Sequence, residues 1–260
     1  MTARVPVDGG EVRVDLDHPL DLSLELDLEG PQVRHFGAPR AGSHPYSVPG
    51  FSGSVATGAS CNCEAIRLIP HCNGTHTEGA GHLTREPLPA LLLSVTAVPA
   101  RQTPEGSDPP PQPDDRLLTR EALRALWPPQ PPFAPRALVI RTLPNEPAKR
   151  TRDYTSGTAA YLTREAAQYL VGRGIEHLVV DLPSLDRTHD QGRLSAHRVF
   201  FGLPPGDTAL AHAARAHCTI TELAFVPDEA RDGAYLLQLQ VPAITGDAVP
   251  SRPLLYRLSG

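Results

Sequence analysis

The strongest constraint on the fold is an alternation of predicted strands and helices in the middle of the chain. Residues 91–98 form an apolar run suited to a strand covered on both faces, and the β-rich runs 137–141 and 177–181 follow it. Two Leu-Thr-Arg-Glu-Ala segments separate these runs, and in each the threonine, Thr119 or Thr163, can cap a first helical turn. This order predicts an α/β fold with parallel or mixed strands joined by crossover helices.

The flanking segments also carry strand signals. Apolar and acidic residues alternate with period two over residues 5–28, which predicts an N-terminal β-hairpin or ribbon. Segments 218–226, 235–241 and 254–258 are predicted to be the closing strands. Residues 30–58 are rich in Gly, Pro and Ser but also contain aromatic side chains, so we predict an ordered loop over a pocket. The alternative is that these aromatics close the edges of the core.

Size and charge restrict the classes of protein. We predict a single domain over residues 1–260, with Pro-rich insertions near 104–115 and 128–135 that could be lids, dimer contacts or solvated loops. The net charge is −5 and no Lys/Arg cluster has aromatic neighbours, so we expect no nucleic-acid partner. No apolar run approaches the roughly 20 residues that cross a bilayer, and the N-terminus lacks an apolar signal region. We therefore expect no membrane partner and a cytoplasmic location.

Candidate metal ligands concentrate in residues 70–82, which read Pro-His-Cys-Asn-Gly-Thr-His-Thr-Glu-Gly-Ala-Gly-His. His76 and Glu78 are two residues apart, so in an extended segment both side chains face the same way and can converge on one cation. The small residues before His82 would allow the chain to turn a second imidazole toward the first. A lone histidine is usually a hydrogen-bonded surface or core residue, but no apolar periodicity explains this segment. We therefore predict a metal or catalytic site.

The cysteines allow a second kind of metal site. Cys61 and Cys63 precede His71 and Cys72 closely enough for a structural zinc site of mixed ligands. The usual spacing of two to four residues within a cysteine pair is absent, and inert buried thiols explain the same residues. Both interpretations remain open at the level of sequence.

Residues 72–82 resemble a known family motif. They fall without a gap on His-x-Gly-Thr-His-x-Asp-x-Pro-x-His, the hallmark of the metal-dependent cyclase-like hydrolases that include bacterial kynurenine formamidase. Other segments resemble the second half of that family: Tyr161-Leu-Thr-Arg-Glu-Ala-Ala, Gly174-Ile-Glu, Asp181-x-Pro-Ser-x-Asp186, His197-Arg and Ile220-Thr-Glu222-Leu. The resemblance runs from about residue 21 to the C-terminus. It implies a single α/β domain with mixed β-sheets, a swivelling β/β/α topology and, often, a homodimer.

The resemblance also implies a site and a chemistry. One or two divalent ions, Zn²⁺ or Mn²⁺, would activate water for the hydrolysis of an amide. By position, His76 matches a first-site ligand, Glu78 the carboxylate shared between sites, and His82 the catalytic imidazole. His197 and Glu222 match ligands of the second site. Glu78 and His82 are accordingly the predicted catalytic residues.

Three departures separate this chain from the family pattern. Cys72 stands where a ligating histidine is usual; a thiolate binds zinc well but favours a softer ion, and the neighbouring His71 could serve instead. Glu78 replaces aspartate and reaches one methylene further, and Ala80 replaces proline and loosens the loop. These changes indicate a divergent branch, so the formamidase substrate does not transfer with the fold.

The sequence therefore predicts a metal-dependent hydrolase that cleaves a small-molecule amide of the formamide, cyclic imide or lactam type. His82 would pass a proton to the leaving nitrogen, a role suited to a side chain that titrates near neutral pH. Asp181, Ser184 and Asp186 are candidates for supporting roles around the site or for structural roles, and a plain turn at the strand end explains Pro183-Ser184. The alternative is a non-hydrolytic member: a lyase or isomerase, or a metal- or ligand-binding protein that has lost catalysis.

Overall fold

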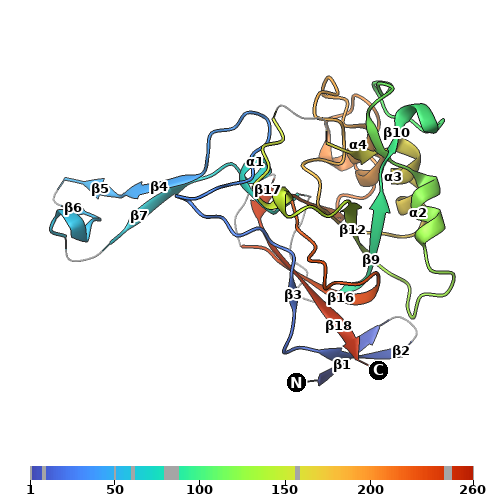
Figure 1. The fold of residues 1–260 in the computed structure, drawn as a ribbon, viewed down its shortest axis with the longest axis horizontal. Coiled ribbons are helices and arrows are strands. Elements are labelled where there is room, and N and C mark those ends of the chain that lie inside the picture. Colours follow the sequence, from blue (N-terminus) through green and yellow to red (C-terminus); the bar gives the residue numbers. More distant parts are fainter. Residues whose placement is uncertain are drawn as a thin grey trace.

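The structure is a computed structural model, and it describes residues 2–7, 10–49, 51–59, 62–78, 88–155, 159–242 and 248–259. These residues form an α/β fold around one long mixed β-sheet, with helices packed against one of its faces (Figure 1). The predicted fold class is thereby confirmed.

Parallel strands occupy the centre of the sheet, as the alternation of strands and helices predicts. The central elements, in chain order, are β9 (Leu88–Thr96), α2 (Arg120–Leu126), β12 (Ala137–Leu143), α3 (Arg164–Gly172), β14 (His177–Val180), α4 (Ser195–Phe201) and β15 (Thr219–Glu222). The four strands pair in parallel in this same order. The Thr119 and Thr163 hydroxyls accept the amides of Ala122 and Ala166 at 3.1 and 3.0 Å, so both predicted helix caps are confirmed.

Antiparallel strands extend the sheet on both sides. Beyond β15 lie β8 (His76–Glu78) and β17 (Ala248–Pro250). Beyond β9 lie β16 (Gly233–Gln240), β18 (Arg252–Ser259), β2 (Gly10–Asp15) and β1 (Thr2–Val7), and β3 (Leu20–Asp21) also pairs with β18. The N-terminal hairpin is confirmed, but residues 22–28 continue without the regular strand that their alternation predicts.

The core lies on both faces of β9. Leu91, Leu93 and Val95 are buried against the helices, and Ala90 and Leu92 are buried in a second cluster on the opposite face. The prediction of a strand covered on both faces is therefore confirmed. Because the central strands carry no polar face, the polar side chains of the sheet collect where these strands end.

The Pro-rich insertion 104–115 is packed into this body. The buried Glu105 carboxylate accepts the amides of Arg120 and Glu121 at 2.7 and 3.1 Å and the Thr163 hydroxyl at 2.6 Å. It thus joins the N-termini of α2 and α3, which rules out the solvated-loop interpretation for this part of the insertion. A three-stranded sheet lies beside it, formed by β10 (Val98–Pro99), β11 (Arg116–Leu118) and β13 (Tyr161–Leu162).

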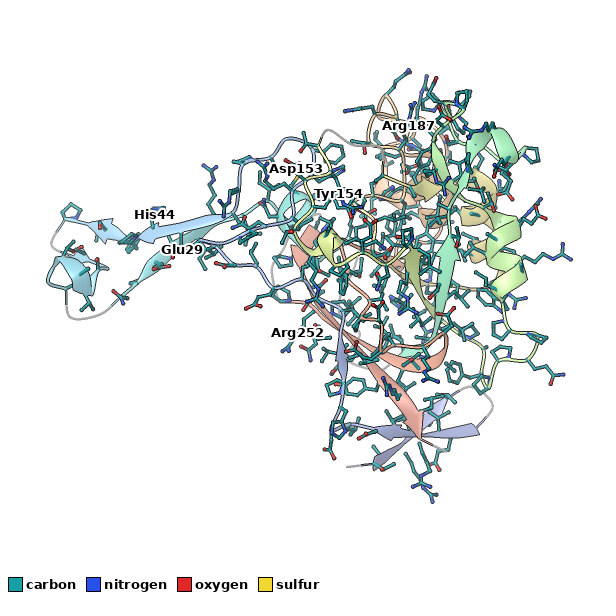
Figure 2. All side chains as sticks on the ribbon, in the orientation of Figure 1. Glu29, His44, Asp153, Tyr154, Arg187 and Arg252 are labelled. Carbon is teal, nitrogen blue, oxygen red and sulfur yellow. The ribbon has the colours of Figure 1, made fainter. Side chains whose placement is uncertain are left out.

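The prediction of an irregular ordered loop over residues 30–58 is wrong for its second half. This part contains β4 (Gly42–Pro45), β5 (Ser47–Val48) and β6 (Phe51–Ser52), and β4 pairs with β7 (Glu64–Arg67). The described residues between 42 and 67 form an arm that projects from the body, and Figure 2 shows the His44 side chain on it (Figures 1 and 2). Period two is absent from the arm sequence because neither face of the arm is buried against the core.

None of the helices in the described ranges combines the length and the apolar character needed to cross a lipid bilayer.

Candidate metal site

Strand β8 places two of the predicted ligands on one face. It pairs antiparallel with β15, with His76 opposite Glu222 and Glu78 opposite Ile220. The prediction that His76 and Glu78 lie in an extended segment is therefore confirmed, and Glu222 joins them from the neighbouring strand. On the opposite face, Thr77 bonds to the hydroxyls of Thr221 at 2.6 Å and Ser251 at 2.8 Å, which holds the register of β8.

His76 is oriented by its backbone. Its Nδ1 lies 3.0 Å from the carbonyl oxygen of Gly74. Since a carbonyl only accepts, Nδ1 carries a proton, and Nε2 presents a lone pair when the ring is neutral. His76 Nε2 is buried and has no hydrogen-bond partner in the described part of the chain. It lies 3.5 Å from Glu78 Oε1 and 3.6 Å from Glu222 Oε2, separations too long for hydrogen bonds.

His197 reaches the same place from α4. The Asp186 carboxylate accepts its Nδ1–H at 2.7 Å, so Nε2 again faces inward, 3.4 Å from Glu222 Oε1 and 3.8 Å from Glu78 Oε2. Asp186 also accepts the amides of Ala196 and His197 at the start of α4, at 2.7 and 3.1 Å. One carboxylate thus fixes both the helix end and the imidazole, a pairing typical of metal-ligating histidines.

The structure places His71 and Cys72, the two alternatives at the position where the family pattern has its first histidine, differently. His71, on the short helix α1 (Pro70–Asn73), places Nδ1 3.4 Å from Glu78 Oε1. Cys72 is buried beside it and belongs to neither candidate ligand group in the described part of the chain. Burial raises the pKa of the Cys72 thiol, which disfavours the thiolate that a metal requires.

Two triads of ligand atoms result: His71, His76 and Glu78, and Glu78, His197 and Glu222. Within each triad the ligand atoms lie within 4.8 Å of one another. Glu78 belongs to both triads, with Oε1 toward the first and Oε2 toward the second. Imidazole nitrogens and carboxylate oxygens around an unpartnered buried nitrogen fit one or two divalent cations. The predicted catalytic His82 lies outside the described residues, as does Cys61 of the possible structural zinc site.

Electrostatics favour a cation in this cluster. Burial alone lowers the pKa of His76, but Glu222 and Glu78 reverse the effect and raise it to about 9. The pKa of His197 is also raised well above its usual value, because Asp186 and Glu222 outweigh burial. Burial raises the pKa of Glu78, but His71 and His76 bring it well below its ordinary value. The cluster therefore holds protons on its imidazoles in the metal-free protein, and a cation would replace them.

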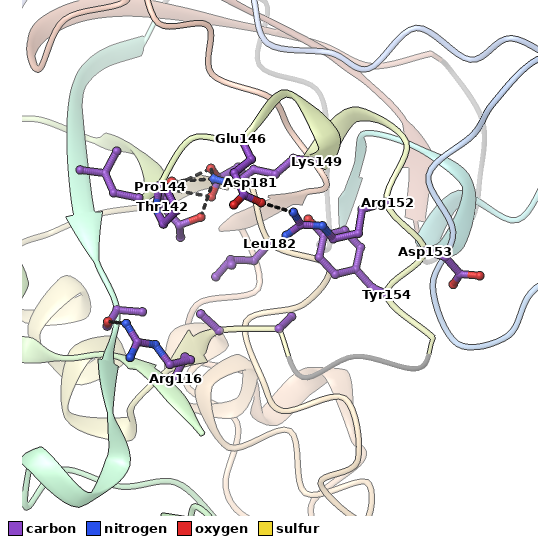
Figure 3. A pocket seen from close by; sticks show the side chains of 14 residues that line it. Arg116, Thr142, Pro144, Glu146, Lys149, Arg152, Asp153, Tyr154, Asp181 and Leu182 are labelled. Atoms are coloured by element: carbon purple, nitrogen blue, oxygen red, sulfur yellow. Dashed lines mark hydrogen bonds and ion pairs between the residues drawn. The ribbon is translucent and has the colours of Figure 1, made fainter. Parts of the chain in front are cut away.

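Asp181, a sequence candidate for a supporting role, lies in a different place. Its carboxylate accepts the Thr142 amide at 2.9 Å and the buried Lys149 ammonium at 2.8 Å (Figure 3). This pair sits in a pocket of about 410 Å³ at the carboxyl ends of β9, β12 and β14. Asp181 thus contacts Thr142 and Lys149, whereas Asp186 is the aspartate bonded to His197 of the cluster. Ser184, the third candidate, accepts the Asp186 amide at 3.2 Å.

His35 is a residue that the sequence analysis missed. Its side chain is fully buried, and neither ring nitrogen has a hydrogen-bond partner in the described part of the chain. Its amide donates to the Cys72 carbonyl at 3.2 Å, which places it against α1. Burial, followed by the nearby His76, lowers its pKa to about 4, so this imidazole is neutral at pH 7. A single histidine in a Gly/Pro-rich segment carried no signal of this position.

Comparison with known proteins identifies the family. The structure is an α/β domain whose two ligand triads gather around β8 and β15. The model of the Cyclase family ("Putative cyclase") matches residues 14–187. The chain belongs to this cyclase family, which confirms the resemblance based on residues 72–82. The matched region includes β8 and ends before His197 and Glu222. No curated protein gives a significant sequence match.

Solved structures share the fold at low sequence identity. A potential metal-dependent hydrolase with cyclase activity is 15% identical, with a TM-score of 0.59 and coverage of 92% of this chain and 98% of its own. An isatin hydrolase bound to the product analogue thioisatinate is 17% identical, with a TM-score of 0.56 and 93% coverage of both chains. Isatin hydrolase A from Labrenzia aggregata is 16% identical, with a TM-score of 0.56 and coverage of 93% and 94%. These similarities show a common fold.

The raised pKa of His76 predicts opposite pH dependences with and without metal. In the metal-free protein the pKa rises on folding from 6.5 to about 9, so this contribution to the free energy of unfolding is fully present below about pH 6.5 and is lost as the pH rises through about 9. A cation needs the neutral imidazole, so its affinity should rise over the same range. Calorimetric unfolding and metal titration at several pH values measure both trends. Affinity that is independent of pH would contradict this assignment.

The orientation of His197 by Asp186 makes a second prediction. Asp186→Asn should weaken affinity for Zn²⁺ or Mn²⁺ about 10- to 100-fold, because the carboxylate that holds Nδ1–H is removed. Asp207→Asn is the matched control, since Asp207 accepts from His212 Nδ1 at the same 2.7 Å on the surface. Equal affinities of the two variants in a metal titration would show that Asp186 has only a structural role.

Proposed function

We propose that this chain is a metal-dependent hydrolase that cleaves carbon–nitrogen bonds in small-molecule amides of the formamide, cyclic imide or lactam type. The observation that carries the proposal is the pair of triads sharing Glu78, with the buried His76 Nε2 directed at two carboxylates. Membership of the cyclase family supports it. The ligands we propose are His71, His76, Glu78, His197 and Glu222.

The chain's own residues prepare this site for hydrolysis. A divalent cation held there would lower the pKa of water and polarise a carbonyl oxygen. Gly74 and Asp186 fix the tautomers of His76 and His197, so both imidazoles present Nε2 without reorganisation. Glu222 is held by the Leu185 amide, which donates to Oε1 at 2.7 Å. His82 remains the predicted group that gives a proton to the leaving nitrogen.

Membership of the cyclase family and the similarity to solved structures support an amide as the substrate class. Two of these neighbours are isatin hydrolases, and isatin contains a cyclic amide. A set of three imidazoles and two carboxylates favours Zn²⁺ or Mn²⁺, and a site that uses His71 in place of Cys72 has no thiolate to favour a softer ion. Both ions therefore belong in the assays.

The test is metal content and turnover in one preparation. His76→Ala should lose most of the bound metal and reduce amide hydrolysis at least about 100-fold, because it removes the buried imidazole of the first triad. His212→Ala is the control, since His212 is an exposed histidine bonded to Asp207. Elemental analysis and assays with N-formyl aromatic amides, cyclic imides and lactams give the readouts. Metal bound without turnover of any of these would favour the lyase, isomerase or binding-protein alternative.

The proposed assembly is a homodimer formed through the arm, residues 42–67. Four of the ten large hydrophobic side chains exposed in the described part of the chain lie on it: Tyr46, Val48, Val55 and Ile66. An isolated two-stranded ribbon is marginally stable in water, and exposed apolar patches of this kind mark interaction surfaces. A second copy of the chain would cover these side chains.

Light scattering of the purified protein tests this assembly. We expect twice the chain mass, and Ile66→Lys should shift the population to monomer because it would bury an unpaired ammonium in the contact. Ile66 is 61% exposed, and Leu210→Lys changes a similarly exposed residue (66%) away from the arm as a control. A monomeric parent protein, or identical behaviour of both variants, would contradict the proposal.

A further inference from the structure

A second hollow on the molecule is lined by arginines. It has a volume of about 750 Å³ and lies between α3, α4 and the loops at residues 191–193 and 202–206. Its fourteen lining residues include Arg164, Arg193 and Arg198 but only one carboxylate, that of Asp108. Three cations around one hollow stand out in a chain whose net charge is −5. None of the ligand triad residues lines this hollow.

In the described part of the chain, neither Arg164 nor Arg193 forms an ion pair, and Arg198 lies near one carboxylate, that of Asp207, whose pKa it helps to lower. Arg198 is held by main-chain carbonyls, donating to those of Arg193 at 3.1 Å, Pro204 at 2.9 Å and Asp207 at 2.8 Å. These bonds fix the position of the Arg198 guanidinium beside the hollow. Arg164 and Arg193 are exposed and make no side-chain hydrogen bond there, so their donors remain available.

Uncharged donors complete the lining. Gln168 lies four residues after Arg164 on α3, on the same face of the helix, and Gln191 faces the hollow from the loop before α4. Arginine forks pair with phosphate oxygens in a bidentate geometry, and carboxamides add neutral hydrogen bonds. A hollow of this volume falls in the range of small-molecule sites and exceeds what a bare ion needs.

We propose that this hollow binds a small molecule that carries a phosphate group. A concave site on a chain of net charge −5 favours such a ligand over an extended nucleic-acid backbone, which would need a basic surface along its length. The hollow is separate from the proposed metal centre, but it adjoins Asp186, the residue that orients the proposed ligand His197. Ser195 lines the hollow and donates to Asp186 Oδ1 at 3.3 Å, and Asp186 holds His197.

Calorimetric titration of the full chain tests the proposal, with pyrophosphate and a nucleoside diphosphate as probes and the unphosphorylated nucleoside for comparison. We expect saturable binding of both phosphates that weakens with added salt, and no binding of the nucleoside. The double variant Arg164→Gln with Arg193→Gln should bind about 10- to 100-fold more weakly, because charge-assisted hydrogen bonds are lost. The matched control is Arg120→Gln with Arg124→Gln, two exposed arginines on α2.

The outcomes separate this proposal from the proposed hydrolase function. Absence of phosphate binding would overturn it. Binding retained by the Arg164/Arg193 variant would place the phosphate elsewhere, for example at the metal cluster, and would overturn it as well. Binding of an oligonucleotide but not of the small phosphates would replace it with a nucleic-acid surface. Both arginine variants leave every proposed metal ligand in place, so metal content and amide hydrolysis report on the hydrolase independently.

Discussion

The register of β8 against β15 is the constraint on which the candidate site depends. It sets His76 opposite Glu222 and keeps Glu78 on the same face, so three ligand side chains converge from two short strands. Thr77 holds that register through hydroxyl bonds on the opposite face. A shift by one residue would turn His76 and Glu78 to the face opposite Glu222. The hydrogen-bonded threonines therefore help to maintain the arrangement of the ligand side chains.

The same convergence creates an electrostatic problem that a cation resolves. Glu78 and Glu222 bring two carboxylates into one largely buried cluster, and the structure compensates with protonated imidazoles, as the raised pKa values of His76 and His197 show. Such a cluster favours positive charge at its centre, and the lone pairs of the imidazoles become available when the protons leave. Protons and a metal ion therefore compete for the same imidazole nitrogens, which links the pH dependence of stability to that of metal affinity.

Sequence patterns predicted the centre of this fold well, because buried strands appear as apolar runs and helix starts appear as capping threonines. They failed for the arm, whose strands bury no face and so leave no period-two signal. At the site, a spacing of two placed His76 and Glu78 correctly, but the sequence left His71 and Cys72 as alternatives. The choice depends on how the single turn of α1 orients its side chains. His35 was missed because its position arises only from tertiary packing.

The central claim is that a divalent cation binds between His71, His76 and Glu78. Crystals of the purified protein, soaked in Zn²⁺ or Mn²⁺ and measured at the absorption edge of each metal, test it most directly through an anomalous difference map. The account predicts a peak within about 2.0–2.3 Å of His76 Nε2 and of a Glu78 oxygen, with His71 and not Cys72 as a neighbour. A map without a peak at this cluster, or with the ion bound to Cys72, would contradict it.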